Sequence, residues 1–85
     1  MVAFWADWNV PCRIAAPAME EAARRTAGRV RFGIVPYDEN PDLAARYEVR
    51  GLPTYLVLRG GEVCERRVGL MGRRELTRIV DSCAG

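Results

Sequence analysis

The chain has 85 residues, 49% of them apolar, and a formal net charge of +2. A chain of this length buries about 60–65% of the surface that its unfolded form exposes, so we expect one domain over residues 1–85 with one modest core. The composition excludes fibrous and disordered proteins, and no apolar run reaches the ~18 residues of a membrane-spanning helix.

The first two predicted elements are an apolar strand and an amphipathic helix. Residues 2–6, VAFWA, are short and β-prone, as in a buried strand. Residues 11–27 then carry an apolar stripe at helical spacing, with Gly28 as a stop signal. Pro17 lies inside this helix and removes one backbone donor, so we expect a kink there.

The second half of the chain predicts two helices and three strands. Residues 30–35 form a strand, and Asn40, followed by Pro, is a favourable N-cap for a short helix. Residues 54–68 form a hairpin around Gly60–Gly61, and a last helix covers 72–83. The order β-α-β-α-β-β-α predicts an α/β fold: a four-stranded mixed sheet flanked by helices, because a helical crossover joins parallel strands.

The charge pattern and the N-terminus limit the partners. All 13 basic residues are Arg, and they are scattered along the sequence beside acidic residues. Nucleic-acid binding needs clustered charge, so the scatter favours a solvated surface and no nucleic-acid partner. The N-terminus lacks the basic and small-residue segments of a secretory signal, which predicts a cytoplasmic protein with no membrane partner.

The cysteines are too few and too widely spaced for a metal centre. The chain has no His, and its three Cys are residues 12, 64 and 83, so we expect neither a metal site nor a cofactor. The last helix returns towards the strand that carries Cys64, so Cys64 and Cys83 could approach each other and a disulfide is possible. In a reducing compartment we expect two buried free thiols there rather than a disulfide.

Three separated segments resemble the thioredoxin family. VAFWADWNVPCR resembles the family's strand and WCGPC motif, RGLPT its cis-proline segment, and GGEVCERRVGL its last hairpin, with the glycine at Gly69. The resemblance runs through the whole chain and implies a thioredoxin-like fold in its minimal form, because the family's usual first strand and helix are absent. It also implies the activity of a protein-disulfide oxidoreductase.

The shortened N-terminus makes residues 30–35 a predicted sheet edge. Arg31 and Pro36 suit an edge, since charge and a missing backbone donor both discourage further pairing. Exposed edges nevertheless pair with other chains, so a dimer through the 30–35 strand is a hypothesis.

The resemblance places Asn9 at the attacking position of the redox motif and Cys12 at the resolving position. An amide is no reversible nucleophile, so Cys12 is the one catalytic candidate. Cys12 is either a shielded, small apolar residue or a thiol activated by the helix N-terminus, and the shielded position favours the first. Asn9 either caps the helix or contacts a bound peptide, and we favour the cap.

Three further positions depart from the family pattern. Val10 replaces the motif's glycine. Ala3 and Ile34 stand where the family has a buried carboxylate and a Lys that assist proton transfer at the resolving Cys. These differences, together with Asn9, are consistent with the loss of dithiol–disulfide activity.

The part of the family site that remains is a peptide groove. We define it by the residues of its two lips: Trp8, Val10, Pro11, Leu52, Pro53, Gly69 and Leu70. By resemblance, the proline after Leu52 leaves the Leu52 backbone free to pair with an extended segment of a protein or peptide. The alternative is that these residues are inherited fold architecture alone.

The sequence therefore predicts a thioredoxin-like domain with a degenerate site that binds peptides or proteins with little dithiol–disulfide turnover. One alternative is an atypical oxidoreductase that acts through the single thiol of Cys12 in cell redox homeostasis. Another is a minimal domain kept for its fold.

Overall fold

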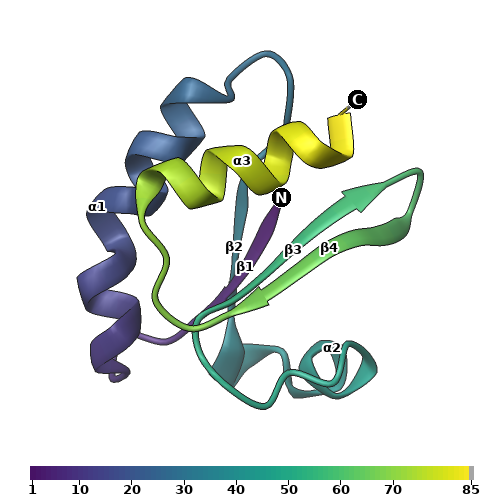
Figure 1. Cartoon of the computed structure of the whole chain (residues 1–85). Coiled ribbons are helices and arrows are strands. Elements are labelled where there is room, and N and C mark those ends of the chain that lie inside the picture. The colour runs from purple at the N-terminus through teal and green to yellow at the C-terminus, as the bar shows by residue number, and fades with distance from the viewer. Residues whose placement is uncertain (85) are drawn as a thin grey trace.

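The computed structural model describes residues 1–84, which form one sheet and its covering helices (Figure 1). In chain order the elements are β1 (Val2–Trp5), α1 (Val10–Arg25), β2 (Gly33–Pro36), the 3-10 turn η1 (Tyr37–Glu39), α2 (Pro41–Arg46), β3 (Thr54–Arg59), β4 (Glu62–Val68) and α3 (Arg73–Ala84). The predicted order β-α-β-α-β-β-α is confirmed.

The four strands lie in the order β2-β1-β3-β4. β1 runs parallel to β2, with Ala3 opposite Ile34, and antiparallel to β3, with Ala3 opposite Tyr55. β3 and β4 form the predicted antiparallel hairpin. The mixed sheet and the edge position of β2 both agree with the sequence-based expectations.

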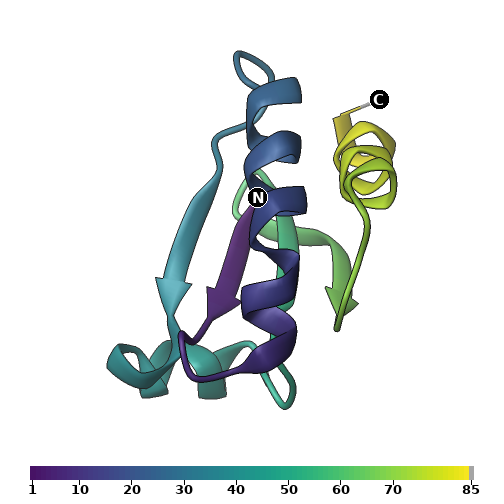
Figure 2. The same ribbon diagram turned by 90° about the vertical axis from the view of Figure 1, so that its left-hand side faces the viewer.

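The two faces of the sheet are covered by different helices. α1 and α3 lie on the same side, as Figure 2 shows, and their apolar residues pack on Ala3, Tyr55 and Val57. The opposite face carries Phe4 and Leu56, which pack against α2 and the segment after it. Alternate residues of a strand point to opposite faces, so both faces of β1 and β3 are buried.

Two predicted boundaries differ from the structure by two residues or more. β2 begins at Gly33 rather than at residue 30, because β1 begins at Val2 and its first ladder partner is Gly33. α1 ends at Arg25, two residues before the prediction, and stays one continuous helix through Pro17 (Figure 1).

Asn40 occupies the N-cap position of α2 but makes no capping hydrogen bond. Its side-chain Nδ2 instead donates to the Pro36 carbonyl at 2.8 Å, which ties the 3-10 turn to the end of β2. The short helix thus starts where it was predicted, and the amide serves the preceding turn.

The expectation of two free thiols at the C-terminal end is wrong: Cys64 and Cys83 form a disulfide. α3 packs back across the sheet, so its last turn lies next to β4. The two Cα atoms are 6.0 Å apart, within the usual range for a disulfide. This bond ties the end of α3 to an edge strand.

Candidate functional site

The N-terminus of α1 is closed by the side chain of Asn9. Its Oδ1 accepts from the Cys12 backbone N–H at 2.9 Å, and its backbone is extended, with φ −87° and ψ 120°. This geometry satisfies one of the unpaired donors of the first turn, and a good cap contributes about 1 kcal/mol. The predicted capping role of Asn9 is confirmed.

Cys12 is the free cysteine of the described residues, and its side chain is 0% exposed. Burial raises the pKa of the Cys12 thiol, a backbone hydrogen bond at Ala6 lowers it in part, and the negative charge of Asp7 raises it again. The thiolate is the nucleophilic form. Cys12 is therefore protonated at neutral pH and out of reach of solvent.

Tyr55, on β3, is also 0% exposed. Within residues 1–84 its hydroxyl has no hydrogen-bond partner. Burial, and to a smaller extent the negative charge of a Cys12 thiolate, raise the pKa of Tyr55 to about 12. The titratable groups that interact electrostatically with the Cys12 thiol thus include this phenol and Asp7.

Ala3 and Ile34 face each other across the β1–β2 ladder, and neither carries a charge. Ala3 is fully buried, whereas Ile34 is 47% exposed. Ala3 also lies opposite Tyr55 in the β1–β3 ladder, and both side chains belong to the core cluster under α1 and α3. No carboxylate lies at this buried ladder position to exchange a proton with Cys12.

A small hollow of about 180 Å³ joins the two lips of the predicted groove. Its lining residues are Trp8, Asn9, Tyr37, Arg50, Gly51 and Leu52. A Cβ built on Gly51 would lie 2.9 Å from Cγ1 of Val68, so a side chain at this position would require Val68 to shift.

The indole of Trp8 is 62% exposed but held in place. Its Nε1 donates to Oδ2 of Asp38 at 2.7 Å. Sequence reasoning missed Asp38 and the lining role of Tyr37, although one signal was present. β1 and β2 are parallel and Trp5 pairs with Pro36, so the residues after both strands emerge at the same edge of the sheet.

The second lip is built around Pro53. The Leu52–Pro53 peptide bond is cis, and the Gly69 N–H donates to the Pro53 carbonyl at 2.9 Å. β3 begins only at Thr54, so Leu52 takes part in neither neighbouring ladder. Gly69 has φ +97°, a conformation that favours glycine.

The remaining groove residues flank this hollow without lining it. Val10 and Leu70 are exposed by 57% and 54%, Pro11 is half-buried, and Pro53 is buried. The start of α1, the loop before β3 and the loop after β4 lie at one end of the molecule (Figure 1). The structure therefore brings Trp8, Asn9 and Leu52 together and leaves two apolar side chains exposed beside them.

Two absences within residues 1–84 bear on other kinds of function. No cluster of three or more His, Cys, Asp or Glu side chains in this range has the arrangement of a metal site. No helix in the same range has the length and apolar character needed to cross a membrane.

The strand order, the capped start of α1 and the cis Leu52–Pro53 bond at the same end define a thioredoxin-like domain. A family model described as thioredoxin matches residues 1–82, and the chain belongs to the thioredoxin family.

Known proteins of the family cover nearly the whole chain. A thioredoxin from Allochromatium vinosum is 44% identical over 82 residues, which is 96% of this chain and 77% of that protein. A chloroplastic M-type thioredoxin from Zea mays is 38% identical over 85 residues, covering 100% of this chain and 51% of that protein.

Solved structures agree with this assignment. The crystal structure of chloroplastic thioredoxin z, described as defining a type-specific target recognition, matches with a TM-score of 0.84 and 33% identity. The match covers 99% of this chain and 77% of that one. A malarial protein matches with a TM-score of 0.87 at 22% identity, covering 95% of this chain and 91% of that chain, which shows the fold alone.

Proposed function

We propose that this chain binds an extended segment of a protein or peptide in the groove between Trp8 and Leu52, with little dithiol–disulfide turnover. Thioredoxins act on protein substrates, and the groove residues are the part of that site that this chain keeps. The observation that carries the proposal is a contrast in exposure. The one free thiol is 0% exposed, whereas the Trp8 indole beside it is 62% exposed.

The shape of the groove supports an extended peptide rather than a small molecule. Pockets for drug-sized ligands measure ~300–1,000 Å³. The hollow here, about 180 Å³, is smaller and suits one side chain. Leu52 lies outside the ladders, so its backbone is available for β-type pairing, with Trp8 and Leu70 as apolar contacts on either side.

Two residues of the site disfavour redox turnover. By resemblance, Asn9 stands where a cysteine would attack, and its amide oxygen is engaged in the cap of α1. Cys12 is buried and its pKa is raised, so neither exposure nor thiolate character assists it. Oxidoreductase activity through Cys12 alone would require the first turn of α1 to open.

A turnover assay tests the redox half of this proposal. Insulin reduction with dithiothreitol should proceed at the rate of the buffer control, and Cys12→Ser should leave that rate unchanged. Activity well above buffer that disappears in Cys12→Ser would instead establish the single-thiol oxidoreductase.

Binding is tested by selecting peptides from a random 12-residue phage library and measuring their affinity by calorimetry. The Trp8→Ala substitution should weaken the selected peptides at least tenfold, because it removes the largest exposed apolar surface of the groove. Val63→Ala is the matched control, since Val63 is 41% exposed on β4, outside the groove. Equal affinity for wild type and Trp8→Ala would place the peptides elsewhere.

A second copy of the chain is the other partner that we propose, through the edge of β2. The 47% exposed Ile34 lies on this edge, and it lines an apolar hollow of about 260 Å³ together with Trp5, Met19 and Phe32. Edge strands with apolar surroundings pair with other chains. Sedimentation showing only a monomer at millimolar concentration would remove this dimer.

A further inference from the structure

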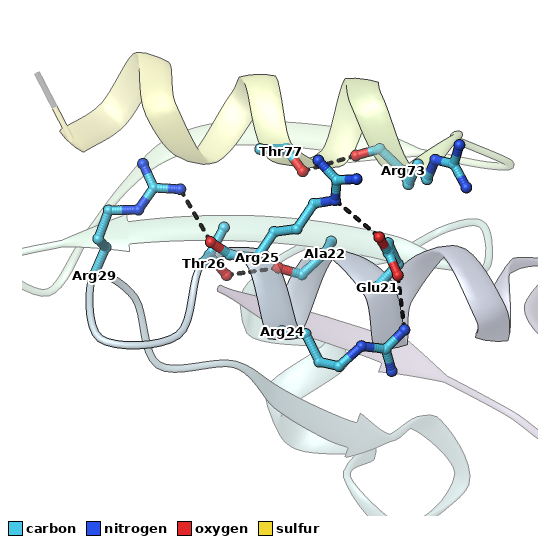
Figure 3. Close-up of polar contacts among 8 residues, drawn as sticks. All are labelled: Glu21, Ala22, Arg24, Arg25, Thr26, Arg29, Arg73 and Thr77. Carbon is cyan, nitrogen blue, oxygen red and sulfur yellow. Dashed lines mark hydrogen bonds and ion pairs between the residues drawn. The ribbon is translucent and has the colours of Figure 1, made fainter.

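The arginines that are scattered in the sequence gather in space between α1 and α3. Figure 3 shows Arg25 of α1 reaching towards α3 at Thr77, with Arg73 further along the same helix. A cavity of about 450 Å³ opens here, and its lining residues are Arg25, Arg73, Arg74, Thr77, Arg78 and Asp81. We call this the basic cavity.

The arginines on the α1 side have carboxylate partners. Glu21 pairs with two of them, with its Oε1 2.9 Å from Arg25 Nε and its Oε2 2.7 Å from Arg24 (Figure 3). Asp81, the one carboxylate that lines the cavity, lies 2.6 Å from Arg29. Glu21 and Asp81 are therefore already engaged.

The arginines on the α3 side have none. Within residues 1–84, no carboxylate lies within ion-pair distance of Arg73, Arg74 or Arg78, although Glu75 and Asp81 are three residues to either side of Arg78. All three arginines are exposed. Their guanidinium groups are free to bind an anion.

The resulting charge exceeds that of the whole chain. The four arginines that line the cavity, together with Arg24 and Arg29, give six positive charges against the three negative charges of Glu21, Glu75 and Asp81. The excess of three is larger than the formal net charge of +2 for all 85 residues. The rest of the chain therefore carries a formal net charge of −1.

This arrangement works against the stability of α3. Arg73 and Arg74 lie in its first turn, where the helix dipole favours negative charge. Arg74 and Arg78 are spaced i, i+4, a spacing at which like charges repel. A bound anion would relieve both effects.

We propose that the basic cavity binds an anion that carries a chain of two or more phosphates, such as inorganic tripolyphosphate or the triphosphate of a nucleotide. Guanidinium groups hold phosphate oxygens in two-point hydrogen bonds, and here three unpaired ones surround a single hollow. The cavity volume of about 450 Å³ exceeds the room that one phosphate needs, and several guanidinium groups match several charges. Arg25 lies roughly 22 Å along the α1 axis from Val10, so this site is separate from the peptide groove.

Calorimetry at 50 mM salt tests the proposal with sodium tripolyphosphate as the probe. We expect saturable one-to-one binding, with orthophosphate at least tenfold weaker because it meets fewer guanidinium groups. ATP is the second probe. If ATP binds with the same affinity as tripolyphosphate, the site recognises the phosphate chain alone. If ATP binds tenfold more tightly, the site recognises a nucleotide.

The variant R73Q/R78Q should weaken tripolyphosphate binding at least tenfold. The control R13Q/R46Q removes the same charge at exposed positions outside the cavity and should change affinity less than twofold. Both variants should keep the wild-type circular dichroism, and R73Q/R78Q should melt no lower than wild type because it relieves repulsion on α3.

Three outcomes would overturn the basic cavity as a phosphate site. The first is no saturable binding to wild type, and the second is an equal loss of affinity in both double variants, which would reflect net charge alone. The third is a single-stranded oligonucleotide that binds while tripolyphosphate does not, which would identify a nucleic-acid surface.

Discussion

Reduction of the Cys64–Cys83 disulfide should cost the protein a large share of its stability. The bond closes a loop with a sequence separation of 19 residues. In the chain-entropy model a loop of this length restricts the unfolded state by about 3 kcal/mol. Domains of this size have free energies of unfolding of roughly 5–15 kcal/mol, so the loss is substantial.

The thermal consequence follows from the size of the domain. For 60–100 residues, 1 kcal/mol corresponds to a shift in Tm of about 4–8 °C, so the reduced protein should melt roughly 12–24 °C lower. Cys83 is 4% exposed in the last turn of α3, so reduction should also loosen that turn first. The assay is a thermal melt followed by circular dichroism, with and without a phosphine reductant.

The control is Cys64→Ser, which removes the exposed partner and leaves the buried one in place. It should melt like the reduced wild type and should not respond to reductant. A thiol count on the unreduced, denatured protein should give one group, that of Cys12. Three thiols in that count, or a change in unfolding free energy below about 1 kcal/mol on reduction, would refute the reasoning.

Three further predictions concern Tyr55, Cys12 and Asn9. Tyr55→Phe removes a hydroxyl that has no partner within residues 1–84, so urea denaturation should show a gain of about 1 kcal/mol, and a loss of that size would reveal a partner. Alkylation of Cys12 should be slow at pH 7, and its rate should still rise above pH 9, because burial raises the pKa of the thiol and only the thiolate reacts. An alkylation rate that levels off by pH 8 would contradict the burial of the thiol. Asn9→Ala should lower the free energy of unfolding by about 1 kcal/mol. Asn9→Asp should keep most of the wild-type stability, since a carboxylate also accepts from the Cys12 N–H. Equal stabilities of the two variants would argue against the cap.

The parts of the fold set by local pattern were predictable from the sequence. Strand and helix order follow from apolar periodicity, and Arg31 and Pro36 are residue types that suit the edge position of β2. The cap at Asn9 was predictable because it depends on a residue type and a contact three positions along.

The errors and omissions share one cause, which is contact between segments that are distant in sequence. The Cys64–Cys83 bond depends on how far α3 folds back over β4, a distance that no local pattern encodes. The basic cavity depends on α3 crossing beside the second half of α1, which brings Arg25 to Arg73 and Arg78. The hydrogen bond of Trp8 to Asp38 required the parallel register of β1 and β2.

The two tryptophans are placed so that the protein carries its own optical reporter. Trp8 stands in solvent at the rim of the hollow, while Trp5 is half-buried against the core formed with α1 and α3. In a Trp5→Phe variant all indole fluorescence would come from Trp8. Its emission should shift to shorter wavelength when a peptide excludes water from the groove, and it should stay constant when an anion fills the basic cavity.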